Sequence, residues 1–271
     1  MSAEHGIEAG DPAEFLVRPD GTVLGDDGTG GTLAAALPYT GRLARRMGEL
    51  VEVGDLRVME AFGTHRLTVG VTWTPAGEGT YRAALTPLAP RTMPTYTVVG
   101  AVDTTAAVTH CLQRLAGVDG VVWGSVVTAG ARVIGAVGER QDLHHLAEVG
   151  NRMLAILRSL EDQHATGFMR LRFEQGAVIG ASLGRHALVA RASTAEDEEL
   201  VAIIDEIRAI LAGHDLASVT SEFDPSAEPS GASDEPDPPA SVPARPALPV
   251  GARYRGAGQR TERPRRGLFG R

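Results

Sequence analysis

The sequence feature that most constrains the fold is a long amphipathic helix expected over residues 142–163. Asp142 stands at its N-cap position, where a carboxylate accepts hydrogen bonds from the backbone N–H groups of the first turn. Apolar side chains then recur at steps of three and four residues and form one stripe: Leu143, Leu146, Val149, Met153, Leu157 and Leu160. A helix with one apolar stripe has to bury it against another layer, so the neighbouring segments must supply that layer.

The segments around this helix are expected to be strands, with a further helix at each end of residues 104–212. The first helix is expected near 104–115, after Asp103. The last is expected over 194–212, where Ser193 and Glu196 form a capping box. Strand-like runs, separated by short turns, lie at 121–128, 132–137, 168–174, 178–183 and 187–192. This order predicts an α/β (α+β) fold in which helices sandwich a five-stranded antiparallel sheet.

Residues 14–86 repeat the same order of elements with pieces missing. Two short strands come first, a helix with an interruption at Pro38 follows over 33–53, and three strands complete the set. No leading or closing helix is evident. We therefore expect two tandem units, divided as follows: a flexible N-terminus at 1–13, a degenerate unit at 14–86, a linker at 87–103, a second unit at 104–213 and a tail at 214–271.

The tail is expected to be disordered over its whole length, because residues 222–251 are dense in proline, serine, alanine and acids and show no apolar periodicity. The last residues reverse the charge and form a basic and apolar motif: Arg263, Arg265, Arg266, Leu268 and Phe269. Such a motif on a long spacer is typical of a tethered ligand. Its expected target is an acidic groove on a partner protein or an anionic membrane surface.

The charge of the chain argues against a nucleic-acid partner. The formal net charge is −8, and residues 222–271 hold 7 acids and 8 arginines, so the rest of the chain is more acidic still. Cys111 is the only cysteine, no apolar run is long enough for a membrane span, and the start is unlike a signal peptide, so a cytoplasmic protein is expected. All 26 basic residues are arginine, which indicates GC-rich bacterial coding.

The residues that most resemble catalytic or ligand-binding groups do not form a site in the sequence. The glycine-rich residues 27–32 lack the lysine of a phosphate-binding loop. His144 and His145 are adjacent and would point about 100° apart on a helix, which does not suit one metal ion. Cys111 has no evident base, and Ser125 and Ser182 lie inside strand patterns. We therefore expect no catalytic residue, no metal and no cofactor, and a chain that is not an enzyme.

Residues 104–212 resemble the roadblock/LC7 family. The turn Gly117–Gly120 matches the family's xVxG turn, Gln141 and Asp142 begin its long helix, and FEQGAVIGASLGRHALVARAS matches its three closing strands. Residues 14–86 share the pattern weakly. Profilin-like and PAS-like sensor folds are the nearest alternatives.

The resemblance implies a regulatory protein without catalytic residues of its own. Roadblock proteins dimerise through the long helix and a neighbouring edge strand, and many bind or regulate Ras-like small GTPases. Carried over to this chain, the partner is a Ras-like GTPase or a second roadblock unit, in a homodimer or an internal pseudo-dimer. The expected interface is Leu146, Val149, Met153, Ile156, Leu157, Leu160, Phe168 and Arg170. The alternatives are a structural or cytoskeletal scaffold that recruits through the tail motif, and a PAS- or profilin-like sensor.

Overall fold

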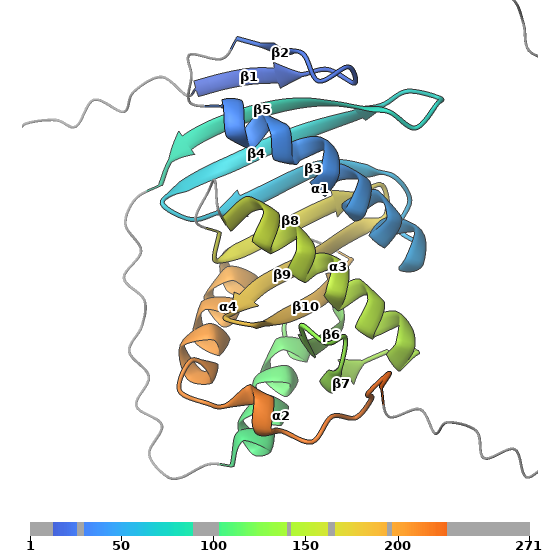
Figure 1. Ribbon diagram of the computed structural model, residues 1–271. Helices are drawn as coiled ribbons and strands as arrows, with labels where there is room; N and C mark the ends of the chain where they lie inside the picture. Colours follow the sequence, from blue (N-terminus) through green and yellow to red (C-terminus); the bar gives the residue numbers. More distant parts are fainter. Residues whose placement is uncertain are drawn as a thin grey trace, which may run out of the picture. The chain divides into compact units, whose positions relative to one another are not determined.

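The strands of both halves of the chain join in one ten-stranded antiparallel sheet (Figure 1). The computed structural model describes residues 13–25, 30–88, 103–139, 142–161, 166–193 and 197–226. From one edge to the other the strands are β2 (Val23–Leu24), β1 (Ala13–Val17), β5 (Gly79–Pro87), β4 (His65–Trp73), β3 (Leu56–Phe62), β8 (Phe168–Phe173), β9 (Gly176–Leu183), β10 (His186–Ala192), β6 (Val121–Thr128) and β7 (Val133–Gly138). The five-stranded sheet expected from the sequence is therefore too small.

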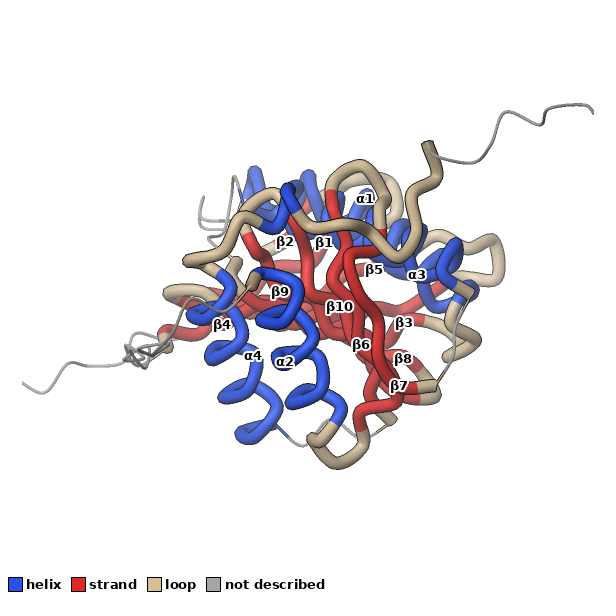
Figure 2. The backbone as a smooth tube through the Cα atoms, turned by 90° about the horizontal axis from the view of Figure 1, so that it is seen from below, coloured by secondary structure: helices blue, strands red, loops and turns tan. Residues whose placement is uncertain are grey.

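Four helices cover this sheet within the described residues: α1 (Gly31–Leu50), α2 (Thr104–Ala116), α3 (Leu143–Glu161) and α4 (Asp197–Leu211). Helices α1 and α3 lie side by side on one face, where they bury one hydrophobic core against both halves of the sheet (Figure 1). Helices α2 and α4 pack together on the other face and bury a second core against the second half, which Phe62 of β3 borders (Figure 2). Among the described residues, helices thus cover the rest of the first half of the sheet on one face only.

The two halves of the sheet have equivalent strand orders. Counted outward from the centre, β3, β4, β5, β1 and β2 correspond to β8, β9, β10, β6 and β7. The junction between the halves is the antiparallel pair β3–β8, in which Met59 lies opposite Leu171 and Phe62 opposite Phe168. Helix α1 is the counterpart of α3, and it contacts α3 directly above this junction. The two halves therefore pair with one another inside a single chain, which is the arrangement that the internal pseudo-dimer hypothesis expects.

The long helix begins where its sequence predicts. The carboxylate of Asp142 accepts the backbone N–H of His144 at 3.0 Å, so the expected N-cap is confirmed. Asp103 occupies the N-cap position of α2, but its side chain makes no capping hydrogen bond there. The hydroxyl of Ser193 donates to the carbonyl of Gly120 at 3.2 Å, and Glu196, its expected partner in a capping box, lies outside the described residues.

Helix α1 runs through Pro38 without a break, so the interruption expected there is wrong. A proline inside a helix costs about 3 kcal/mol, because it removes a hydrogen bond and crowds the preceding turn. Burial on both sides of Pro38 offsets this cost, since Leu33, Leu37, Ala44 and Met47 are all at most 3% exposed. The packing of the helix on the sheet therefore decides its length, and local propensity does not.

Part of the segment expected to be a disordered tail is folded. After α4, residues Leu216–Ser218 form a short 3-10 helix, and the side chains of Leu216 and Val219 are buried. The chain then reaches the outer edge of β7, where the backbone N–H of Val133 donates to the carbonyl of Phe223 at 3.0 Å. The boundary expected at residue 213 is therefore wrong by at least the length of this segment.

Candidate protein-interaction surfaces

The residues predicted as a binding interface are buried inside the folded body. Each of them is at most 4% exposed, and none is available to a second protein in this structure: Leu146, Val149, Met153, Ile156, Leu157, Leu160, Phe168 and Arg170. Their burial leaves Met153, Ile156 and Leu160 with no exposed apolar surface for a separate partner protein. The apolar stripe of α3 packs against the second half of the sheet and against α1.

A buried carboxylate holds three arginines at this junction. Glu60 on β3 has a side chain 3% exposed, and Arg170 on β8 lies directly opposite it. The Nε of Arg170 donates to Oε2 of Glu60 at 2.6 Å, and the Nε of Arg172 lies 3.1 Å from the same oxygen. Arg66 on β4 donates to the other carboxylate oxygen. This Glu60 cluster joins β4, β3 and β8 through side chains as well as through the backbone ladder.

Two opposing effects act on the charge of Glu60. Burial on its own raises the pKa of a carboxyl, but hydrogen bonds from Arg66 and Arg170 and the attraction of Arg170 and Arg172 outweigh it, so the pKa of Glu60 lies below its ordinary value. Burial also lowers the pKa of Arg170, and the carboxylate of Glu60 opposes that change. The cluster therefore holds an ionised carboxylate at neutral pH.

The lowered pKa of Glu60 makes the stability of the protein depend on pH. A carboxyl whose pKa is lower in the folded state contributes stability above its unfolded pKa, and this contribution is lost as the pH falls through the folded pKa. We expect the free energy of unfolding to fall below about pH 4.5, the ordinary value for Glu60. Urea unfolding across that range, compared with Glu60→Gln, measures the effect. A variant that loses as much stability with acid as the natural chain would place the pH dependence elsewhere.

The first half of the sheet leaves its second face without a helix among the described residues. This face, which we call the bare face, consists of three cross-strand rows on β1, β5, β4, β3 and β8. The rows are Leu16–Arg82–Gly70–Val58–Arg172, then Glu14–Ala84–Thr68–Glu60–Arg170, then Thr86–Arg66–Phe62–Phe168. At the β3–β8 border the face ends: Glu60 and Arg170 are buried, and Phe62 and Phe168 pack into the core beneath α2 and α4.

The sequence explains why no described helix on the bare face corresponds to α2 or α4. On β9 the residues that face these helices are apolar, for example Ile179 and Ala181. The equivalent strand β4 presents Arg66 and Thr68 in their place. A polar sheet face is stable in water and needs no covering layer.

Helices α1 and α3 form a second exposed surface, on the opposite side of the sheet. The outward stripe of α1 includes Ala35, Tyr39, Arg42 and Arg46, at steps of three and four residues. Tyr39 is 47% exposed, although aromatic residues are scarce in this chain. The exposed residues of α3 include Asn151 and Arg158. We call this the two-helix face.

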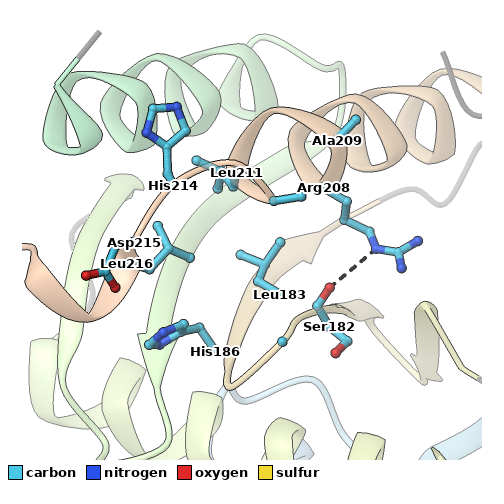
Figure 3. Close-up of a pocket in the computed structure, with 11 residues that line it drawn as sticks. Ser182, Leu183, His186, Arg208, Ala209, Leu211, His214, Asp215 and Leu216 are labelled. Carbon is cyan, nitrogen blue, oxygen red and sulfur yellow. Dashed lines mark hydrogen bonds between the residues drawn. The ribbon is translucent and has the colours of Figure 1, made fainter. Parts of the chain in front are cut away.

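A pocket of about 500 Å³ lies between the end of α4, the β9–β10 turn and the segment that follows α4 (Figure 3). Leu183, Leu211 and Leu216 give it apolar walls. The Nε of Arg208 donates to the carbonyl of Ser182 at 3.3 Å. Burial lowers the pKa of the His186 imidazole. No hydrogen bond between a hydroxyl and a histidine joins the described lining residues, so the pocket shows no nucleophile–base pair.

The other residues weighed for chemistry have ordinary structural roles. Cys111 is fully buried, and burial raises the pKa of its thiol to about 11, so the thiol is protonated at neutral pH. Within the described residues, no cluster of three or more metal-ligating side chains occurs. The hydroxyl of Ser125 donates to the carbonyl of Gly135. The ring of His144 stacks on Phe223, with centroids 6.0 Å apart.

The structure indicates five candidate residues that the sequence patterns do not: Tyr39, Glu60, Arg66, Arg82 and Arg172. The polar alternation of β4, in which Arg66 and Thr68 flank buried Leu67, is the pattern that would have indicated a solvated sheet face. The tail motif of arginines, Leu268 and Phe269 lies outside the described residues.

No helix in the described part of the chain has the length and apolar character needed to cross a membrane.

Comparison with known proteins gives a resemblance to solved structures alone. No protein-family model matches the chain, and no curated protein matches it. Among solved structures, the chain is similar to a roadblock/LC7 domain from Streptomyces avermitilis, with a TM-score of 0.32 and 16% sequence identity. That similarity covers 40% of this chain and 89% of the other.

Proposed function

We propose that this chain is a non-enzymatic protein-interaction module that receives a protein partner on the two-helix face. The exposed stripe of α1 supports the proposal, because Tyr39 stands 47% exposed beside Arg42 and Arg46. Tyrosine and arginine are the residue types that most often dominate the binding energy of protein interfaces. A large aromatic ring exposed in a chain with few aromatic residues has no role in the core of this protein.

The internal pairing of the two halves supports the same proposal. It buries the apolar stripe of α3 within the chain and sets α1 and α3 side by side as one continuous outer surface (Figure 1). A partner therefore meets this surface without a second copy of the chain. The sequence resemblance of residues 104–212 to the roadblock/LC7 family implies the class of partner, which is a Ras-like small GTPase.

Tyr39→Ala tests the proposal. Purified full-length chain is titrated against the Ras-like GTPases of the source cell, each loaded with GDP or with a non-hydrolysable GTP analogue, and binding is followed by biolayer interferometry. We expect one GTPase to bind in one nucleotide state. We expect Tyr39→Ala to weaken it at least ~10-fold, because a truncated hot spot costs about 2 kcal/mol or more.

Thr86→Ala, on the bare face, serves as the matched control and should leave the affinity unchanged. Equal binding by Tyr39→Ala and the natural chain would exclude the two-helix face. Binding by none of the GTPases in either state would remove the GTPase as partner and leave the scaffold hypothesis, which co-sedimentation with cytoskeletal polymers tests.

A small-molecule sensor is the second candidate, and the pocket beside α4 favours it. Its volume of about 500 Å³ falls in the range of ligand sites, and its walls combine leucines with Arg208 and His186. A metabolite that binds there should raise the unfolding temperature of the natural chain, and Leu211→Trp should abolish that rise by filling the pocket. A rise that survives Leu211→Trp would place the ligand elsewhere.

A further inference from the structure

We infer that the bare face binds an acidic, extended segment of a partner protein, laid across strands β5, β4, β3 and β8. The inference builds on the proposed role as an interaction module, but it concerns the opposite side of the sheet from the two-helix face and does not require a GTPase. The inference rests on arginines from both halves of the chain, which lie around an open strip of the sheet.

The charge of the bare face sets the chemistry of the partner. The three rows contain Arg66, Arg82, Arg170 and Arg172 against Glu14 and Glu60, while the chain as a whole has a net charge of −8. This face carries more arginines than acids, although the protein as a whole is acidic. It therefore attracts an acidic partner that the rest of the protein repels. Guanidinium groups bind carboxylates in paired hydrogen bonds, so an acidic peptide is the matching ligand.

The exposure of the arginines shows which of them reach a partner. The side chains of Arg66 and Arg172 are 40% and 42% exposed, and Arg82 is exposed on β5. Arg66, Arg170 and Arg172 all contact Glu60. Arg170 is buried and supports the surface from beneath, whereas Arg66 and Arg172 keep part of their side chains exposed to solvent. The partner-facing groups are therefore Arg66, Arg82 and Arg172, two from the first half of the chain and one from the second.

The row between Arg82 and Arg172 gives the spacing of the expected acids. Gly70 and Val58 separate these arginines, so their strands lie three spacings, or about 14 Å, apart. Four residues of an extended chain span about 13 Å. Carboxylates at positions i and i+4 of an extended segment therefore match the two arginines.

Gly70 keeps the middle of this row open. A Cβ built at Gly70 would meet only the carbonyl oxygen of Arg82, at 4.0 Å, and no other atom within that distance. The backbone of Gly70 is not in the left-handed region, so any side chain can stand there without strain. A larger or acidic residue at this position would block the strip while leaving the fold intact.

Gly70→Glu is the decisive variant. A fluorescein-labelled peptide of ~12 residues, with glutamate at every fourth position and serine and threonine between, is titrated into the full chain and followed by fluorescence anisotropy at ~50 mM salt, where screening is weak. We expect Gly70→Glu to weaken binding at least ~10-fold and Arg82→Gln to weaken it several-fold. In ¹H–¹⁵N spectra, the peptide should shift amides of β4, β5 and β8.

The controls separate this surface from general charge attraction and from the two-helix face. A peptide with glutamine in place of glutamate should not bind, and Arg42→Gln with Arg46→Gln should bind the acidic peptide as the natural chain does. Unfolding temperatures should agree among all variants. Unchanged affinity in Gly70→Glu, or an equal loss in the Arg42 and Arg46 variant, would overturn the inference. Neither outcome bears on Tyr39, so the proposed function and this inference fail separately.

Discussion

Replacing Glu60 by alanine is expected to destabilise the protein by about 3–5 kcal/mol, the usual cost of removing one partner of a buried ion pair. Arg170, with a side chain 2% exposed, loses this carboxylate, and Arg66 and Arg172 remain close to it as like charges. Because domains of this kind are stable by only about 5–15 kcal/mol, the change is a large fraction of the total. Urea unfolding followed by circular dichroism measures it.

A second cross-junction pair provides the matched control. Arg57 and Glu174 also join the two halves, but their side chains are 53% and 41% exposed. Exposed pairs contribute about 0–1 kcal/mol, since water screens them, so Glu174→Ala should cost little. If Glu60→Ala cost no more than Glu174→Ala, the buried cluster would not stabilise the junction. Glu60→Leu combined with Arg170→Met should recover part of the loss, because no buried charge is then left.

Much of the fold follows from local patterns in the sequence. The helix expected over 142–163 is observed as Leu143–Glu161, and the strand expected over 121–128 has the same bounds in the structure. Both depend on periodicities that a short window reveals. The joining of the halves into one sheet depends on β3 and β8, which are about a hundred residues apart. A local sequence pattern does not show which strand edges pair with each other. The sequence therefore predicts a sheet of half the observed size.

The folded segment after α4 escaped prediction for a related reason. Its apolar anchors are Leu216, Val219 and Phe223, at steps of three and four residues, but three positions are too few to predict a helix, and only Leu216–Ser218 form a short 3-10 helix. The segment packs against parts of the chain that are distant in sequence, such as the edge of β7, where Phe223 pairs with Val133. Composition alone therefore places the end of the folded body too early.

The candidate sites divide in the same way. The sequence identifies the apolar stripe of α3, but the stripe looks the same whether it meets another protein or the other half of its own chain. The Glu60 cluster unites residues from β3, β4 and β8, and its parts are more than a hundred residues apart. The polar alternation of β4 was readable in the sequence, but it indicates a solvated face only once the strand's neighbours are known.

Replacing Ile156 by aspartate should have the largest effect of any substitution considered. Ile156 is 0% exposed and belongs to the core that α1 and α3 share with the sheet. Losing its side chain alone costs about 2–5 kcal/mol, and a carboxylate buried there without a partner adds several more. The sum approaches the whole stability of a typical domain. We expect the variant to lose cooperative thermal unfolding and to elute earlier than the natural chain in gel filtration.

The earlier elution follows from the architecture of the junction. When α3 leaves its place beside α1, the edges of β3 and β8 are no longer held together, and unpaired strand edges pair with other chains. Ile156→Val, which removes one methyl group, should cost only about 0.5–1.5 kcal/mol and elute as the natural chain does. Arg158→Asp, on the exposed side of the same helix, should change neither property. A folded Ile156→Asp variant that elutes with the natural chain would show that α3 does not hold the two halves together.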